Sequence, residues 1–371
     1  MANLRGARPL TILTLAFFAI AGSQSAEAFL GFGKKDPPKA IPVDESQVPP
    51  KAVVVTDRPA QQAPNKIDLE SSATSFKMSS GGTSCYVVVQ QGGKDVGAFV
   101  PHNSATNPNT EAAYHGLAAA LGLKGRFQVG VPHQLGSAGI RKFRAVVASG
   151  SYSGHKATNC SKLMGATAKN PSSLNGVYKV WGARPYGYDE MVSGNAPKSS
   201  HAVVRALQAG NSWPSKTELL SFKGASARTS DIAAAYGVVV MFDALFGQWD
   251  RYSGGNVTMA IDGKSFYVYT ADNGGASPSS SSWASKNISR FSRFPREVVE
   301  GFNELEAFLE GRSDSFAGYK DPNAFVRSIG LVYDYSADSY RQQLLKNLKV
   351  IRAHVQKSVS AYGESKALYR L

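Results

Sequence analysis

The stretch FDALFGQWDRYSGGN, Phe242–Asn256, decides how the second half of this 371-residue chain is interpreted. It continues the almost charge-free run IAAAYGVVVM and then places Asp250, Arg251 and Asn256 close together, with two glycines between them. The apolar part is typical of a buried helix, which we expect over Asp231–Gly247. The polar part then leaves that helix as a loop.

A second acidic turn, TADNGG, contains Asp272 and follows two β-rich runs that flank the turn sequence Asp262-Gly263. Such a pattern predicts a hairpin. Because a hairpin returns the chain to its starting point, we expect Asp250, Asn256 and Asp272 to converge. Carboxylate and amide oxygens suit Mg²⁺ or Mn²⁺. Phosphoryl transfer uses one Asp to orient or deprotonate the acceptor hydroxyl and another to hold the metal. The alternative is an exposed ion pair followed by an ordinary turn.

The first half predicts a β-rich unit with one prominent helix. Two β-rich runs, Cys85–Gln90 and Val96–Val100, flank a Gly-Gly turn and are expected to form a hairpin. The preceding SSGGTS is a glycine turn with freely presented backbone N–H groups. A helix is predicted over Thr110–Gly122, with Thr110 as N-cap and Glu111 in its first turn. RKFRAVVASG and GVYKVWG are expected to be further strands.

The rest of the second half is expected to be mostly helical. PREVVEGFNELEAFLEG and SYRQQLLKNLKVIRAHVQKSV have apolar residues at helical spacing. The serine-rich Ser277–Ser285 is interpreted as a flexible loop. Cys85 and Cys160 would form a disulfide in an oxidising compartment or remain as two buried thiols. The scattered histidines give no zinc-binding pattern.

The N-terminus predicts export. Arg5 and Arg8 precede the apolar stretch Leu10–Gly22, and Ala26–Ala28 supplies the small residues of a cleavage site. We therefore expect a signal peptide over 1–28, with cleavage near Ala28, and a secreted or periplasmic protein without a later membrane span. An uncleaved anchor is the alternative. Residues 29–74 follow as a proline-rich, poorly ordered linker.

The charge balance points to anionic partners. The chain has a formal net charge of +14, with 43% hydrophobic and 18% charged residues, so it has enough apolar residues for a large core. Excess positive charge favours phosphate groups or other polyanions as partners. No block of five or six basic residues occurs, and we do not expect nucleic acid as a partner.

Taken in order, these pieces resemble the atypical secretory-pathway kinases of the Golgi casein kinase and four-jointed type, with HipA and the phosphatidylinositol kinases as more distant relatives. MFDALFGQWDR and YTADNGG resemble the family's helix end, aspartate-arginine loop and aspartate-asparagine-glycine turn. SSGGTSCYVVVQQGGKDVGAFVP and NTEAAYHGLAAALG resemble its glycine turn, first strands and glutamate-bearing helix. The resemblance spans roughly 79–363. It implies an α+β, two-lobed protein-kinase-like fold, with a β-rich N-lobe over 75–210 and a mostly helical C-lobe over 211–371.

The resemblance also implies an activity and its residues. The expected reaction is transfer of the ATP γ-phosphate, with Mg²⁺ or Mn²⁺, to a hydroxyl of a protein or glycan. The implied roles are catalytic base for Asp250, metal ligands for Asp272, Asn256 and Glu111, and a nucleotide-binding set of Gly81, Gly82, Thr83 and Glu111.

Two departures from the family pattern leave the activity open. Val100 stands where the family has a nucleotide-binding lysine, so the missing charge would have to come from Lys94, Lys156 or Lys179. Asn256 also lies one residue later after Asp250 than the corresponding asparagine of related kinases. The alternatives to an active kinase are a nucleotide-binding pseudokinase that acts as a regulator or binding partner, and a non-catalytic envelope-binding protein.

Overall fold

The computed structural model describes residues 67–80, 82–102, 107–123, 127–253, 255–279, 281–332 and 335–371. The predicted signal peptide, most of the predicted proline-rich linker and Gly81 lie outside the described residues. Within the described residues, no helix has both the length and the apolar character that a membrane crossing needs.

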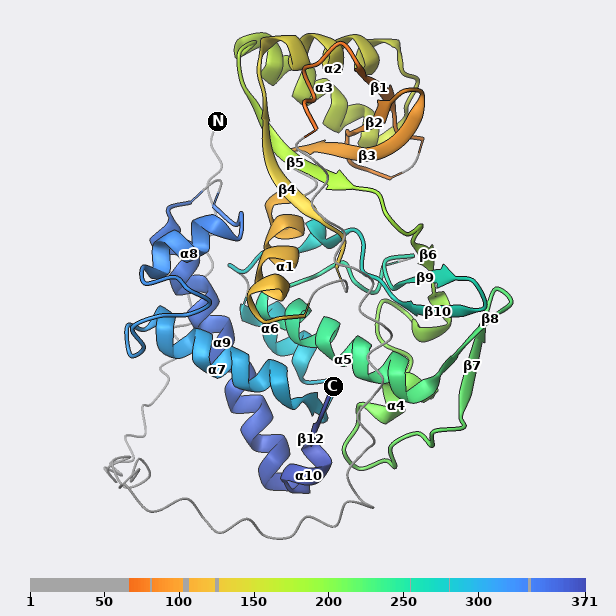
Figure 1. The fold of residues 1–371 in the computed structure, drawn as a ribbon, viewed down its shortest axis with the longest axis vertical. Coiled ribbons are helices and arrows are strands. Elements are labelled where there is room, and N and C mark those ends of the chain that lie inside the picture. Colours follow the sequence, from red (N-terminus) through yellow and green to blue (C-terminus); the bar gives the residue numbers. More distant parts are fainter. Residues whose placement is uncertain are drawn as a thin grey trace, which may run out of the picture. The chain divides into compact units, whose positions relative to one another are not determined.

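The N-lobe is built on one five-stranded sheet with the strand order β1-β2-β3-β5-β4, in which every neighbouring pair is antiparallel (Figure 1). Its strands are β1 (Thr74–Met78), β2 (Val87–Gln91), β3 (Lys94–Pro101), β4 (Gly130–Leu135) and β5 (Leu174–Val180). The predicted hairpin is confirmed as β2 and β3. Gly92 and Gly93 form its turn with φ of 55° and 76°, which glycine adopts without steric cost.

Three helices accompany this sheet: α1 (Pro108–Ala120), α2 (Ser137–Ser149) and α3 (Gly154–Lys169). The predicted glutamate-bearing helix is confirmed as α1. The prediction of Thr110 as its N-cap is wrong, because Asn107 occupies that position and its side chain accepts a hydrogen bond from the Asn109 N–H.

The sequence RKFRAVVASG forms part of α2, so the prediction of a strand there is wrong. Ile140, Phe143 and Val147 recur at helical spacing and are all buried, which outweighs the β propensity of the two valines. The predicted strand GVYKVWG is confirmed as the greater part of β5. Cys85 and Cys160 form a disulfide, which decides between the two alternatives that the sequence left open.

The C-lobe is organised around α5 (Thr229–Leu245), the predicted buried helix. The predicted hairpin is confirmed as β9 (Thr258–Asp262) and β10 (Ser265–Val268), although Asp262 still pairs with Ser265, so that the turn residues are Gly263 and Lys264. This hairpin lies in a second five-stranded sheet of order β6-β9-β10-β8-β7. The other three strands of this sheet are β6 (Tyr186–Gly187), β7 (Leu219–Phe222) and β8 (Ala225–Arg228). A separate two-stranded sheet consists of β11 (Phe294–Pro295) and β12 (Leu368–Tyr369).

The remaining elements are mostly helices. They are η1 (Asp189–Met191), α4 (Ala202–Ala206), η2 (Asn273–Gly275), α6 (Ser281–Ile288), α7 (Arg296–Leu309), α8 (Pro322–Ser328), α9 (Ala337–Tyr362) and α10 (Glu364–Ala367). Of these, α4, α6 and α9 pack directly on α5, while α7, α8 and α10 contact α9. The two predicted amphipathic helices are confirmed as α7 and α9. The prediction of a flexible loop over Ser277–Ser285 is wrong in its second part, where α6 begins, because Ala284 and Ile288 are buried on one helical face.

Two hydrophobic cores hold the described residues together, one under the N-lobe sheet and a larger one in the C-lobe. The helix α1 belongs to the larger core. Tyr114 and Leu117 on α1 are fully buried, and the Tyr114 ring stacks on that of Phe246 with a centroid distance of 4.7 Å. The helix that carries Glu111 is thereby fixed to the C-lobe while it contacts the N-lobe strands β4 and β5.

Candidate functional site

A cavity of about 830 Å³ is lined by residues of both lobes. The N-lobe supplies Gly82, Thr83 and Ser84 of the glycine turn, together with side chains from β3 and β5. From the other side come Glu111 of α1 and Asp272, which precedes η2. The cavity therefore brings together the glycine turn, the helix glutamate and the second acidic turn, three pieces that are far apart in the sequence.

An ion pair between Lys179 and Glu111 lies in this cavity. Lys179 Nζ donates to Glu111 Oε1 at 2.7 Å, and the same oxygen accepts the backbone N–H of Gly274 at 3.2 Å. Burial alone would lower the pKa of Lys179, but the negative charges of Glu111 and Asp272 outweigh it and raise that pKa. The Lys179 ammonium is therefore fixed in its charged form beside two carboxylates.

Lys179 reaches the cavity because of the strand order. It stands on β5 opposite Ala98 of β3, and Val100 pairs with Val177 two residues away. Of the three lysines that the sequence offered in place of one at position 100, Lys179 alone lines the cavity among the described residues. Lys156 instead donates to the carbonyl and hydroxyl oxygens of Ser79 at 2.6 and 2.7 Å, and Lys94 is exposed at the β2–β3 turn.

Arg251 connects the two loops that were expected to converge. Its side chain is fully buried and makes two hydrogen bonds of 2.9 Å to the carboxylate of Asp243, at the end of α5. It also donates to Asn273 Oδ1 at 2.7 Å. The alternative of an exposed ion pair is thus excluded for Arg251. No role was predicted for Asp243 or Asn273, although both stand in the quoted motifs and Asn273 directly follows Asp272.

Further bonds of Arg251 fix the backbone on both sides of the site. Its Nη1 donates to the carbonyl oxygens of Asn256 at 3.0 Å and Ala271 at 3.4 Å. Tyr114 of α1 donates its hydroxyl to Asp243 Oδ1 at 2.8 Å. Burial opposes the charge of Arg251, but Asp243 more than compensates and raises the pKa of the guanidinium. A buried charge network of this kind holds the loop of Asp250 and the turn of Asp272 in one arrangement.

Asp250 is half-buried and hydrogen-bonded by its own loop. The Ser253 hydroxyl donates to its carboxylate, and Asn256 Nδ2 donates to Asp250 Oδ2 at 3.1 Å and to its carbonyl oxygen at 2.8 Å. Burial, assisted by the nearby charge of Asp272, raises the pKa of Asp250 against the effect of these hydrogen bonds. Asp250 and Asn256 are therefore in contact, and Asp272 is close enough to act on Asp250 electrostatically.

Asp272 stands in a left-handed backbone conformation, with φ of 60° and ψ of 51°. Among residues with a side chain, Asn and Asp adopt this conformation most readily. The turn therefore presents an exposed carboxylate at the edge of the cavity from a rigid backbone, since the following residues Asn273, Gly274 and Gly275 are all buried.

The donor atoms in the cavity suit a divalent cation. Glu111 Oε2 is buried and accepts no hydrogen bond, and Asp272 is the second carboxylate that lines the cavity from the C-lobe side. The described residues contain no cluster of three or more His, Cys, Asp or Glu that would enclose a metal by itself. Mg²⁺ is usually held by one or two carboxylates, with substrate phosphates and water as the other ligands. Glu111 and Asp272 would supply the one or two carboxylates that such a site needs.

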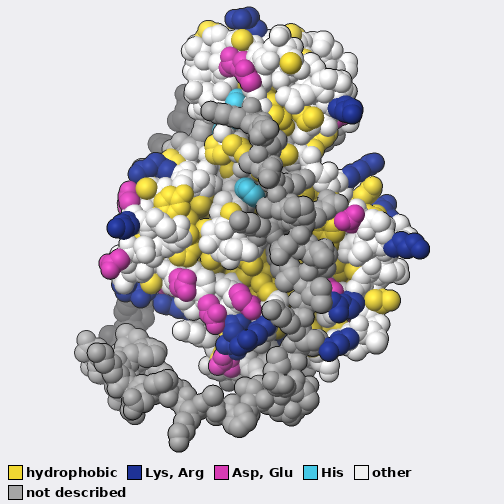
Figure 2. All heavy atoms as spheres, in the orientation of Figure 1, with side chains coloured by type: hydrophobic (Ala, Val, Ile, Leu, Met, Phe, Trp, Pro, Cys, Tyr) yellow, Lys and Arg dark blue, Asp and Glu magenta, His cyan; other side chains and the backbone are white. Residues whose placement is uncertain are grey.

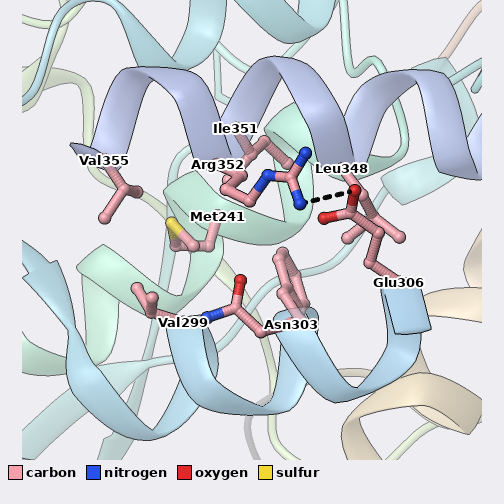
Figure 3. Close-up of a pocket in the computed structure, with 9 residues that line it drawn as sticks. Met241, Val299, Asn303, Glu306, Leu348, Ile351, Arg352 and Val355 are labelled. Atoms are coloured by element: carbon pink, nitrogen blue, oxygen red, sulfur yellow. Dashed lines mark ion pairs between the residues drawn. The ribbon is translucent and has the colours of Figure 1, made fainter. Parts of the chain in front are cut away.

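A separate small pocket of about 10 Å³ lies between α5, α7 and α9 and shares no residue with this cavity. Figure 3 shows Glu306 of α7 pointing toward Arg352 of α9, with an ion pair of 3.2 Å between them, above Met241 of α5. The space is about that of one water molecule. This pocket therefore concerns the packing of the C-lobe helices.

No family model and no curated protein matches the sequence. Solved structures do match it. A crystal structure of the Golgi casein kinase with Mn/ADP bound aligns with a TM-score of 0.51 and 14% identity over 82% of this chain and 78% of that chain. A second crystal structure of the Golgi casein kinase gives a TM-score of 0.51 and 14% identity over 81% of this chain and 76% of that chain. The structure of hydra Fam20 with sugar aligns with a TM-score of 0.46 and 11% identity over 80% of this chain and 88% of that chain. The predicted resemblance is thus confirmed at the level of the fold, and the chain has the two-lobed α+β fold of the Golgi casein kinase.

Proposed function

We propose that this protein is a kinase that transfers the γ-phosphate of ATP, with Mg²⁺ or Mn²⁺, to a hydroxyl of a protein or glycan. One observation carries the proposal. The ion pair of Lys179 and Glu111 lies in a cavity between the glycine turn and Asp272, with the lysine held in its charged form. Phosphoryl transfer depends mainly on positioned charges around the phosphates, and these residues supply them.

Within this proposal, Lys179 binds phosphate oxygens in place of the side chain that position 100 lacks. Glu111, through its free carboxylate oxygen, and Asp272 hold the metal. When bound, the metal neutralises charge on the β- and γ-phosphates. Backbone N–H groups of Gly82 and Thr83 face the phosphates, and Gly81 has the same proposed role.

Asp250 is the proposed base that accepts the proton of the acceptor hydroxyl. Its raised pKa favours this role, because a carboxylate of higher pKa is a stronger base. Ser253 and Asn256 fix its orientation through their hydrogen bonds. Asn256 donates through its amide nitrogen, and we propose its amide oxygen as a further metal ligand.

We further propose that the protein acts after export, in the periplasm or outside the cell. The predicted signal peptide over 1–28 and the Cys85–Cys160 disulfide both support this location, since disulfides persist in oxidising compartments. The proposed lobes are 75–210 and 211–371, although β6 and α4 of the first range contact β9 and α5 of the second. No nucleic-acid partner is proposed.

A pseudokinase is the second candidate function, because Val100 replaces the expected lysine and Lys179 is already bonded to Glu111. A non-catalytic envelope-binding protein has less support. Figure 2 shows Lys and Arg side chains in small groups over the visible face, interspersed with acidic ones, rather than in one basic patch. A polyanionic surface would be bound best by a continuous patch.

The test is calorimetric binding of ATP and ADP with Mn²⁺, followed by measurement of ATP turnover. Lys179→Met should weaken nucleotide binding by about ten- to a hundredfold, as expected for one charge-assisted contact. Val100→Lys should restore part of that affinity in the Lys179→Met background and add little to the wild type. Lys94→Met, on the exposed turn of the same sheet, is the matched control.

Each outcome separates two functions. Nucleotide binding with turnover supports a kinase, and binding without turnover indicates a pseudokinase. Absence of any nucleotide binding by the wild type would leave the envelope-binding alternative. Equal effects of Lys179→Met and Lys94→Met would contradict the role given to Lys179.

A further inference from the structure

The glycine turn is fastened to the helix α3 at three points. Lys156 binds Ser79, the first residue of the turn, through two hydrogen bonds of 2.6 and 2.7 Å. Asn159 Nδ2 donates to the carbonyl oxygen of Thr83 at 2.9 Å. Cys160 forms the disulfide with Cys85, at the end of the turn.

These three residues stand on one face of α3, because positions separated by three and four residues are neighbours on a helix. All three are buried, so solvent does not compete for their contacts. Lys156 also lies 5.6 Å from the centre of the Tyr86 ring, and Tyr86 lines the cavity. One face of one helix therefore contacts the chain before, within and after the segment Gly82–Ser84 that lines the cavity.

A glycine-containing turn gains much freedom when it is not held. Fixing one backbone residue costs about tenfold in a binding constant, and this cost falls on the ligand if the protein has not already ordered the residue. The contacts from α3 hold the chain at Ser79, Thr83 and Cys85 before any ligand arrives.

We infer that α3 is a positioning element for phosphate binding, in which Lys156, Asn159 and Cys160 hold the glycine turn in the conformation that faces the phosphates. The inference rests on the proposed nucleotide site. It assigns Lys156 to the turn rather than to the nucleotide, and it makes the affinity for the phosphate groups depend on residues that do not contact them.

The experiment compares binding of Mn²⁺–ADP and of adenosine, by calorimetry, to the wild type and to Lys156→Met and Asn159→Ala. Each variant should lose about tenfold in affinity for Mn²⁺–ADP and less than twofold for adenosine, because adenosine lacks the phosphates. Lys169→Met, at the exposed end of the same helix, should change neither affinity. Lys156→Arg should recover part of the loss, since it keeps a cationic donor at the same position.

Unchanged affinity for Mn²⁺–ADP, or an equal loss for both ligands, would overturn the inference, because an equal loss indicates general damage to the fold. Asn159→Ala leaves Lys156 in place and tests the same point if Lys156→Met does not fold. A wild type that binds neither ligand would refute the proposed function. In that case amide hydrogen exchange over 82–86 still tests the fastening, which requires faster exchange in Lys156→Met and in a Cys85→Ala, Cys160→Ala double variant. Unchanged exchange in both would overturn it.

Discussion

At the scale of single residues, the backbone of Asp272 determines which substitution tests its charge. Its left-handed conformation is strained for alanine but accessible to asparagine. Asp272→Asn should therefore abolish metal-dependent nucleotide binding while changing the free energy of unfolding by only about 0.5 kcal/mol, as for other exposed positions. Calorimetry with and without Mn²⁺ measures the first effect and urea unfolding the second. Unchanged Mn²⁺–nucleotide affinity would show that Asp272 is not a metal ligand.

Asp250 is tested by both rate and pH. Asp250→Asn should leave nucleotide binding nearly intact and reduce phosphoryl transfer by about 10²–10⁴-fold, the usual contribution of a positioned base. Because burial raises the pKa of Asp250, wild-type transfer should fall as the pH decreases through that raised pKa, where the base becomes protonated. A wild-type rate in the variant would exclude Asp250 as the base, whatever the shape of the pH profile.

The position of Lys179 in the cavity shows where residue-level prediction from sequence ends. The acidic residues were predictable because each stands in a short local motif next to a turn. Lys179 was only one of three candidates, because its approach to Glu111 depends on β5 pairing with β3. That pairing joins segments far apart in the chain, and local patterns carry no information about it.

At the scale of elements, the helices α1, α5, α7 and α9 and the hairpins β2–β3 and β9–β10 were predictable from apolar spacing and turn residues. The errors arose where the local signal was ambiguous. The valines of α2 favour a strand, and only the burial of Ile140, Phe143 and Val147 on one face distinguishes a helix. The serines within α6 have lower helix propensity than alanine, and packing of Ala284 and Ile288 provides the stabilisation that the local sequence lacks.

The contact between α7 and α9 gives a prediction at this scale. Glu306 is almost fully buried, and its burial raises the pKa of the carboxyl even though Arg352 lies 3.2 Å away. Arg352→Met should destabilise the protein by about 1–2 kcal/mol at neutral pH, because the buried carboxylate loses its counter-charge. The loss should shrink at acid pH, where Glu306 is protonated. Urea unfolding at two pH values measures it.

Lys357→Met is the matched control for that prediction, since Lys357 is an exposed residue of the same helix. Glu306→Gln should be nearly neutral, because the amide carries no charge to desolvate. Equal stability of the Arg352→Met variant and the wild type would mean that water or the neighbouring Lys349 and Arg312 replace the lost partner.

At the scale of the whole molecule, His102 links the N-lobe sheet to the C-lobe. It follows β3, its Nε2 donates to Asn109 Oδ1 at 2.6 Å, and Asn109 in turn donates to the carbonyl oxygen of Val332 at 3.1 Å. Burial lowers the pKa of His102 to about 4. Between pH 6.5 and 4, His102 binds a proton in the unfolded chain but not in the folded protein. Its contribution to the free energy of unfolding is therefore complete above pH 6.5 and is lost as the pH falls toward 4.

The expected loss of unfolding free energy from this group is on the order of 3 kcal/mol across that range. His102→Gln keeps a donor and does not titrate, so its stability should depend less steeply on pH than that of the wild type. His155→Gln, at an exposed position, should follow the wild-type curve. Parallel curves for all three proteins, measured by urea unfolding, would show that His102 titrates normally in the folded state.

The attachment of α1 to the larger core also sets the order in which the chain becomes stable. The Tyr114 hydroxyl meets the Asp243 carboxylate across 129 positions of sequence, so α1 leaves the ribosome long before its packing partner exists. Until α5 has been synthesised, an apolar helix face must stay uncovered. A fragment that ends before α5 would therefore expose a surface prone to association, and a fragment that begins after α1 would leave Phe246 uncovered. The packing of α1 is therefore complete only after α5 and Phe246 have been synthesised.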